Sequence, residues 1–349
     1  MPRLGGVDVR RVLFFGKSMS RTCCTGALVD AMREHGLMVR WRNMATLRRW
    51  LGDDRAARWA RAEFRRFRPD VVFVFFRDLP SLLLSEFRAQ ARVVLWCEEA
   101  LEDLDPTVVE YFRNADLVCL SNPARLPWLR ERGLDNMVFL LSGFQPRFHR
   151  PAPAVRPVRD VAFIGGPGRR GQRAELLAEI SARCSTEIFG MHWDRWTPVH
   201  PGLRVHGPVR PRRYAEICAT SRIVLGTNEV NDDFCYFSNR TFLTLACGGF
   251  HLTHYVPGLE RVFRDGEHLV WFRGRDDALA KIEHWLAREA DRRRVAAGGH
   301  ALAMGHHRYY HRIARVLQIL RDGMPADPLA AIGTPAAGHD VLAPAESGE

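Results

Sequence analysis

The sequence predicts two consecutive α/β domains, each built on a parallel β-sheet, and three observations support this. The chain has 349 residues, which is too long for one ordinary core and suits two domains of roughly 100–200 residues each. In both halves short apolar runs alternate with helical patterns, as in βαβ units. A stretch with prolines at 146, 151, 153 and 157 separates the halves. We therefore expect a first domain at 1–145, a linker at 146–159 and a second domain at 160–321.

The first half contains apolar runs that do not alternate with polar residues, which favours strands buried on both faces. The expected strands are Val12–Phe15, Met38–Trp41, Asp70–Phe76, Arg92–Trp96 and Leu117–Leu120. The expected helices are Thr25–His35, one long region from Met44 to Phe67, and Pro80–Arg88. Strands that alternate with helices in this way predict a parallel sheet.

The second half repeats the alternation after the linker. The expected strands are Val161–Ile164, Glu187–Phe189, Arg222–Leu225, Phe250–His254 and His268–Phe272. The expected helices are Arg173–Cys184, Tyr214–Ala219, Asn239–Cys247, Asp276–Arg288 and His300–Leu320. The tail at 322–349 is rich in proline, alanine and glycine, so we expect it to be disordered.

The composition is that of a globular protein, with 46% hydrophobic and 26% charged residues. No apolar run reaches the roughly 18–20 residues of a membrane helix, and the N-terminus lacks the apolar core of a signal peptide. The eight cysteines include no CxxC pair, which favours reduced thiols and a cytoplasmic protein. The net charge of +11 predicts an anionic partner such as a nucleotide, an acidic lipid surface or nucleic acid. Since all but two of the 51 basic residues are arginines, a GC-rich genome is an equally good explanation.

Ten arginines lie between residues 40 and 68, interleaved with aromatic residues. These aromatics are Trp41, Trp50, Trp59, Phe64 and Phe67. Basic amphipathic helices of this kind lie on anionic membranes, so one interpretation is a peripheral membrane contact. The other interpretation is a surface helix whose aromatic side chains belong to the core.

Ligands of parallel sheets bind at the carboxyl ends of the strands, so the cleft between two such domains is the expected site. The loop Gly165–Gly171 follows a strand and opens a helix. Its small residues let a phosphate approach the backbone, and Arg169 and Arg170 supply charge. A purely structural turn is the alternative.

Two further segments carry polar side chains at strand or helix ends. Ser238–Thr241 precedes a predicted helix, and its hydroxyl, amide and guanidinium groups suit a diphosphate. The alternative is a plain N-cap by Ser238. Glu98 and Glu99 follow a strand, where a carboxylate would serve as a general base towards a hydroxyl group. The alternative is a solvated acidic turn.

His307 and His311 are spaced to bind a metal ion, beside His306. Because the sequence shows no third ligand, we expect these histidines on a solvated helix face instead.

Several runs of the second half occur in an order typical of one protein family. They are Asp160–Gly166, Ile188–Gly190, His206–Val209, Ile223–Asn228, Asn239–Phe250, Pro257–Leu259 and Phe263–Glu267. In this order and spacing they resemble the CgeB-type (spore maturation protein) branch of the GT-B glycosyltransferases. The resemblance covers about 160–320 well. In the first half it rests mainly on Trp96–Glu99 and Phe139–Pro151.

The resemblance implies two Rossmann-like, doubly wound domains that face each other across a cleft, with the closing helix crossing back onto the first domain. It implies an enzyme that moves a sugar from a nucleotide-sugar donor to a hydroxyl-bearing acceptor, which is a glycan, a lipid-linked molecule or a natural product. No cofactor or metal is expected, because helix dipoles and basic side chains neutralise the departing diphosphate. An epimerase of the same fold and a non-catalytic nucleotide- or glycan-binding member are the alternatives. Nucleic-acid binding is disfavoured, because no recognition helix or RNP-like motif is present.

The resemblance also assigns donor-binding positions. Near the diphosphate or the donor sugar it places Gly165, Gly166, Arg169 and Arg170. Near the base it places Pro208, Val209 and Arg210, and near the phosphates Ser238, Asn239, Arg240 and Thr241. Asn228 is a further donor-binding position. One position departs from the family. Leu243 stands where the family has a glutamate that contacts the ribose, and Cys235 where it has an earlier one. Glu229, Asp232 and Asp233 are the acids available as substitutes.

Overall fold

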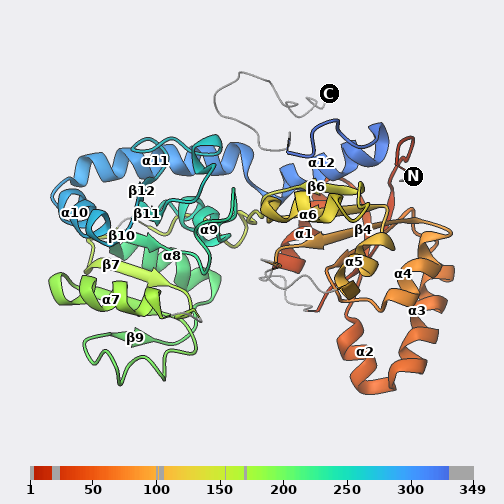
Figure 1. The fold of residues 1–349 in the computed structure, drawn as a ribbon, viewed down its shortest axis with the longest axis horizontal. Coiled ribbons are helices and arrows are strands. Elements are labelled where there is room, and N and C mark those ends of the chain that lie inside the picture. The colour runs from red at the N-terminus through yellow and green to blue at the C-terminus, as the bar shows by residue number, and fades with distance from the viewer. Residues whose placement is uncertain are drawn as a thin grey trace.

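The computed structural model describes residues 4–17, 24–99, 101, 106–153, 155–168 and 171–329. Two six-stranded sheets lie side by side, each with helices on both faces (Figure 1). All strand pairs within the two sheets are parallel. This confirms the predicted fold class of two doubly wound, parallel-sheet domains.

The first sheet has the strand order β2-β1-β3-β4-β5-β6. Its strands are β1 (Arg11–Phe15), β2 (Met38–Arg42), β3 (Val71–Phe75), β4 (Arg92–Cys97), β5 (Leu117–Leu120) and β6 (Met137–Phe139). The five strands expected from the sequence are present, and β6 is an additional short strand. The inner strands β3, β4 and β5 are buried almost throughout, which explains their continuous apolar sequences.

Helices cover both faces of this first sheet. They are α1 (Cys24–Glu34), α2 (Met44–Leu51), α3 (Asp53–Phe67), α4 (Ser81–Arg88), α5 (Pro106–Arg113), η1 (Pro123–Arg125) and α6 (Leu126–Arg130). The single helix expected from Met44 to Phe67 is wrong. Gly52 has φ 77, a left-handed conformation that glycine adopts without strain, and it separates α2 from α3.

The second sheet has the order β12-β11-β10-β7-β8-β9. Its strands are β7 (Arg159–Ile164), β8 (Thr186–Phe189), β9 (Val205–His206), β10 (Ser221–Gly226), β11 (His251–His254) and β12 (Val270–Phe272). Helices α7 (Gln172–Arg183), α10 (Arg275–Leu286) and α11 (Glu289–His306) cover one face, and α8 (Pro211–Thr220) and α9 (Arg240–Ala246) cover the other. A short turn of 3-10 helix, η2 (Leu259–Arg261), precedes β12.

The chain passes between the domains twice. After the first passage it forms the second sheet, and α12 (Tyr309–Asp322) then returns and packs against α1. The range 160–321 predicted for the second domain thus includes a helix that packs with the first. Tyr309 N–H donates to the Phe144 carbonyl at 3.1 Å, and Arg312 Nε donates to the Leu141 carbonyl at 2.9 Å, so the two passages are tied together.

The expectation that the histidines at the second passage lie on a solvated helix face is wrong for His307. His311 is partly buried, and His306 is exposed. His307 is only 3% exposed and stacks on Phe242 with ring centroids 4.8 Å apart. Its Nδ1 lies 2.8 Å from Arg312 Nη2. Burial and the charge of Arg312 hold the pKa of His307 well below its usual value.

Two expectations fall on residues that the structure does not describe, namely Arg169 with Arg170 and the tail beyond residue 329. Within the described ranges, none of the helices is long and apolar enough to span a bilayer.

Candidate functional site

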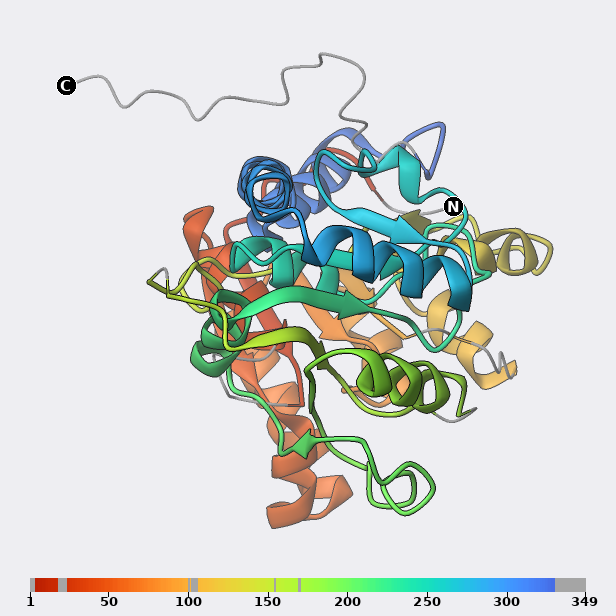
Figure 2. The ribbon, with the colours of Figure 1, turned by 90° about the vertical axis from the view of Figure 1, so that its left-hand side faces the viewer.

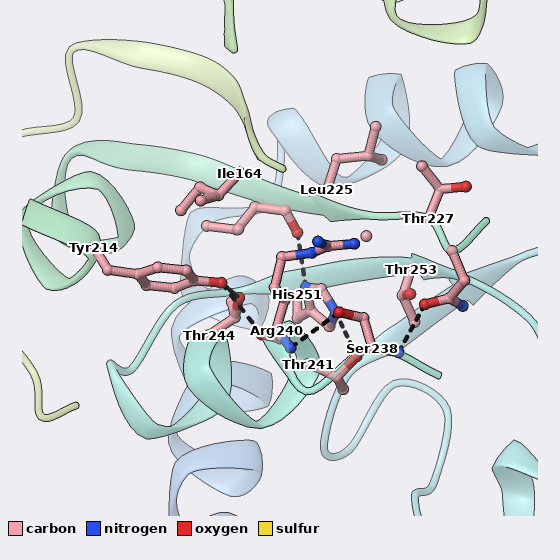
Figure 3. A pocket seen from close by; sticks show the side chains of 13 residues that line it. Ile164, Tyr214, Leu225, Thr227, Ser238, Arg240, Thr241, Thr244, His251 and Thr253 are labelled. Atoms are coloured by element: carbon pink, nitrogen blue, oxygen red, sulfur yellow. Dashed lines mark hydrogen bonds between the residues drawn. The ribbon is translucent and has the colours of Figure 1, made fainter. Parts of the chain in front are cut away.

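The strand order of the second sheet reverses between β7 and β10, and the loops that leave these two strands diverge there. Such a divergence leaves a crevice at the carboxyl edge of a doubly wound sheet. A narrow pocket lies at this point, between β10, β11 and the start of α9 (Figure 3). Its polar side chains are those of Tyr214, Thr227, Asn228, Ser238, Arg240, Thr241, Thr244, His251 and Thr253.

Arg240 is the cation of this pocket. Its half-buried guanidinium lies against Gly165, where a Cβ atom would be 3.0 Å from Nη1. No acidic side chain among the described residues forms an ion pair with it, and burial lowers the pKa of Arg240. Since α9 has only seven residues, the charge of this side chain is the main attraction for an anion. An unpaired, half-buried cation beside a glycine-containing loop is suited to binding an anionic ligand.

Hydrogen bonds within the pocket hold the first turn of α9 in place. His251 Nδ1 lies 3.0 Å from the Val224 carbonyl, and its Nε2 lies 3.3 Å from Thr241 Oγ1. The Tyr214 hydroxyl bonds Thr244 Oγ1 at 2.9 Å (Figure 3). Burial, together with the charge of Arg240, lowers the pKa of His251 to about 4, so this imidazole is neutral at pH 7.

Arg173 is a second cation near the same loop, and it was not among the residues predicted from the sequence. Its side chain is 9% exposed and donates to the Gly166 carbonyl at 2.6 Å and to the Thr227 carbonyl at 3.2 Å. Burial lowers the pKa of Arg173 to about 10, and the neighbouring charge of Arg240 acts in the same direction. Two cations that repel each other at one loop favour a multiply charged anion between them.

A second, wider pocket adjoins the first. Thr227 and Asn228 line both pockets. The second pocket is also bordered by the first turn of α7 and by Glu229, His254 and Arg275. Asn228 Oδ1 accepts from the Ser238 N–H at 2.8 Å, which joins the loop after β10 to the start of α9.

The predicted donor-binding residues therefore divide into groups. Gly165 and Gly166 touch or bond the two cations, and Asn228, Ser238, Arg240 and Thr241 line the first pocket. Asn239 is the residue before α9 and lines neither pocket. Pro208, Val209 and Arg210 precede α8 and also lie outside both pockets. Arg169 and Arg170 are outside the described residues.

The acids considered as substitutes for the missing ribose contact differ in their surroundings. Asp233 accepts from Asn122 Nδ2 at 2.9 Å and from Arg125 Nη2 at 3.0 Å, both in the first domain. Asp232 is exposed and lines neither pocket. Glu229 borders the second pocket, 3.9 Å from Arg173. Of the three, only Glu229 lies beside a pocket.

The two acids at the end of β4 also differ from each other. Glu98 Oε1 accepts from Trp96 Nε1 at 2.9 Å and from the Tyr309 hydroxyl at 2.8 Å, and burial raises the pKa of Glu98. Glu99 is exposed. At the end of the adjacent strand β3, Asp78 is buried and accepts from the Lys17 N–H. Burial raises the pKa of Asp78 to about 6. Asp78 was not among the residues predicted from the sequence.

Residues 169–318 match the family model described as glycosyl transferase-like. This part of the chain is thus similar to glycosyl transferases, and the whole chain has the GT-B fold. The fold is similar to that of HepE from Anabaena, solved with UDP and glucose, at 14% identity and a TM-score of 0.59 over 88% of this chain and 99% of that one. Sucrose-phosphate synthase from Thermosynechococcus elongatus has 11% identity and a TM-score of 0.65 over 89% and 99%. A UDP-N-acetylglucosamine 2-epimerase candidate from Listeria monocytogenes has 12% identity and a TM-score of 0.55 over 91% and 100%.

No curated protein matches this sequence. The predicted class, a glycosyltransferase, is confirmed by the family match, and the predicted fold by the solved structures. The CgeB-type branch stays a prediction, as do the roles of the individual site residues.

Proposed function

We propose that this glycosyltransferase-like protein takes its sugar from a uridine diphosphate sugar and transfers it to a hydroxyl group of the acceptor. The observation that carries the proposal is the unpaired, half-buried Arg240 beside Gly165, with Arg173 as a second cation at the same loop. Such a pair matches the two charges of the diphosphate in a nucleotide sugar. Uridine is the nucleotide of choice because HepE, which has a similar fold, was solved with UDP.

In the reaction the acceptor oxygen forms a bond to the anomeric carbon of the sugar, and the bond from that carbon to the diphosphate oxygen breaks. The bonding electrons leave with the diphosphate, and the acceptor hydroxyl loses its proton. Negative charge therefore grows on the diphosphate in the transition state. Arg240 and Arg173 would stabilise this charge in a partly desolvated pocket, where a fixed cation acts strongly.

The acceptor proton needs a destination, and the carboxyl edge of the first sheet offers one. Glu98 is occupied by two hydrogen bonds, whereas Glu99 is exposed at the same strand end. We assign Glu99 as the better candidate for a general base. Likewise, Glu229 is the better candidate for a ribose contact, since Leu243 offers no polar atom there.

The test is a binding and turnover panel with purified protein. UDP should raise the melting temperature more than ADP or GDP at equal concentration, because a ligand stabilises by RT ln(1 + [L]/Kd). Incubation with UDP-sugars and a mixed set of acceptors should release UDP. Equal stabilisation by all three diphosphates would reject the uridine assignment, and no stabilisation by any of them would reject the donor site.

The same panel decides between transfer and the epimerase alternative, which the fold similarity to the epimerase candidate keeps open. An epimerase returns an altered sugar that is still attached to UDP. A non-catalytic member binds UDP and changes nothing. Four points stay predictions, namely the chemical nature of the acceptor, the independence from metal ions, the cytoplasmic location and the membrane contact of residues 40–68.

A further inference from the structure

Helices α2 and α3 form a hairpin that extends away from the rest of the first domain in both views (Figures 1 and 2). One side of α3 belongs to the core, through Ala56, Ala60, Phe64 and Phe67. The aromatic residues of this region are therefore mostly internal, as one interpretation of the sequence expected. Trp50 is the exception, because it is 79% exposed.

The side of α3 that faces away from the core carries a stripe of arginines. Arg55, Arg58, Arg65 and Arg66 recur at the 3.6-residue helical period, opposite the buried alanines and phenylalanines. All four are exposed, and none has an acidic partner among the residues that the structure describes. We call these four residues the α3 basic stripe.

Other arginines of the region have partners. Arg40 and Arg42 bond Glu63 at 3.0 and 2.6 Å, and Arg61 bonds Glu86 at 2.6 Å. These two carboxylates offset most of the positive charge of the three arginines, whereas the α3 basic stripe has no such partner among the described residues. The excess positive charge of the hairpin therefore lies on its outer surface.

The tip of the hairpin adds an apolar component. Trp50 and Leu51 end α2 just before the turn at Gly52, and Leu51 is 38% exposed. An exposed tryptophan beside an aliphatic residue and a row of cations is typical of segments at a membrane interface, where the apolar side chains enter the acyl boundary and the cations contact lipid headgroups.

We propose that the α2–α3 hairpin docks on an anionic lipid bilayer through Trp50, Leu51 and the α3 basic stripe. Charge complementarity favours this occupant. A second copy would bring two unneutralised stripes together, and the aliphatic Leu51 suits acyl chains better than nucleotide bases. The inference goes beyond the proposed function and does not depend on it, since it uses no residue of the donor pocket.

The first experiment is sedimentation with vesicles. The full chain should bind vesicles of phosphatidylglycerol and phosphatidylcholine in equal amounts, and bind pure phosphatidylcholine vesicles at least tenfold less. Arg58→Glu with Arg65→Glu should weaken binding to the anionic vesicles about tenfold or more, because each cation contributes separately at such a surface. Arg183→Glu with Arg204→Glu is the matched control. It makes the same change in net charge at exposed arginines of the second domain and should leave binding within about twofold.

The second experiment measures insertion of the tip. Brominated lipids in the anionic vesicles should quench part of the tryptophan fluorescence, and Trp50→Phe should lose that quenched part. Because Trp50 is exposed, its replacement should not change the melting temperature, which shows that any loss of binding is not unfolding.

Several results would overturn the proposal. The proposal fails if the stripe variant and the control variant lose vesicle binding equally, or if the wild type does not bind anionic vesicles. It also fails if the fluorescence quenching by brominated lipids persists in Trp50→Phe. Preferential binding of single- or double-stranded DNA oligonucleotides over the vesicles would assign the surface to nucleic acid instead. A dimer in light scattering that Trp50→Ala dissociates would assign it to a second copy of the chain.

Discussion

Replacement of Arg240 by methionine separates a ligand-binding role from a structural one. The side chain lies half-buried against Gly165 and has no acidic partner, so its charge destabilises the empty protein slightly. Methionine retains most of the apolar contact and removes the charge. We therefore expect the unliganded variant to melt at the same temperature as the wild type or above it.

The same replacement should weaken UDP binding. A hydrogen bond to a charged group contributes about 1.5–3 kcal/mol, which corresponds to a Kd about 10- to 150-fold higher. At a UDP concentration 100 times the wild-type Kd, the ligand stabilises the wild type by about 2.7 kcal/mol. For a variant that binds about 30-fold more weakly, the same concentration contributes only about 0.9 kcal/mol. Titration calorimetry and thermal melts with and without UDP measure both quantities.

Arg173→Met is the comparison variant. Arg173 donates to two backbone carbonyls, Gly166 and Thr227, so its loss should lower the melting temperature without ligand and weaken UDP binding as well. The ligand-binding role of Arg240 is refuted if Arg240→Met melts several degrees lower than the wild type without ligand and its Kd for UDP stays within twofold of the wild-type value. Arg240 would then be a structural residue.

Three further predictions concern other parts of the chain. If Glu99 is the general base, Glu99→Gln should lower turnover about 10²–10⁴-fold at unchanged UDP affinity, and similar turnover in this variant and the wild type would remove the assignment. Glu98→Ala should instead lower the melting temperature, because the Trp96 and Tyr309 donors lose their acceptor. The free energy of unfolding should fall as the pH falls from about 6.5 towards 4, because five histidines have folded pKa values below their ordinary 6.5 and bind protons mainly when unfolded. This effect outweighs the opposite effect of two acids whose pKa values are raised, and melts at pH 7.5, 6.5 and 5.5 test the sign. The histidines are His149, His251, His268, His307 and His311, and the acids are Asp78 and Glu98. Asp233→Ala should broaden the distance distribution between labels on the two domains and lower turnover, because it removes the bonds to Asn122 and Arg125, and an unchanged distribution would show that these bonds do not hold the domains.

The sequence predicted the sheets well because their strands carry a local signal. Leu117–Leu120 is a run of four buried residues in a strand with a neighbour on each side, and its limits agree with the expectation. The turn at Gly52 was missed for a related reason. Apolar and arginine-rich periodicity continues on both sides of it, and one glycine interrupts a helical pattern only weakly.

The candidate site was predicted only where its residues follow one another in the chain. Ser238, Arg240 and Thr241 were found because they stand together at the start of α9. Arg173 was missed because it lies in the first turn of α7, and nothing in the sequence shows that its side chain bonds the Gly166 carbonyl. The pairing of Glu98 with Tyr309 spans 211 residues and depends on the return of α12. Burial of His307 depends on the same return, so no local pattern could indicate it.

The loop between β10 and α9 connects the candidate donor site to the contact between the domains. At its first residues, Thr227 and Asn228 line both pockets, and at Asp233 it is held by Asn122 and Arg125 of the first domain. Asn228 also bonds the Ser238 N–H, so both ends of the loop are fixed to the pocket while its middle is fixed to the other domain. A ligand that orders the pocket therefore favours the same loop conformation that the interdomain bonds require. By linkage, the free energy by which donor binding stabilises the interdomain bonds equals the free energy by which those bonds strengthen donor binding. Loss of the Asp233 bonds should accordingly weaken UDP binding even though Asp233 lines neither pocket.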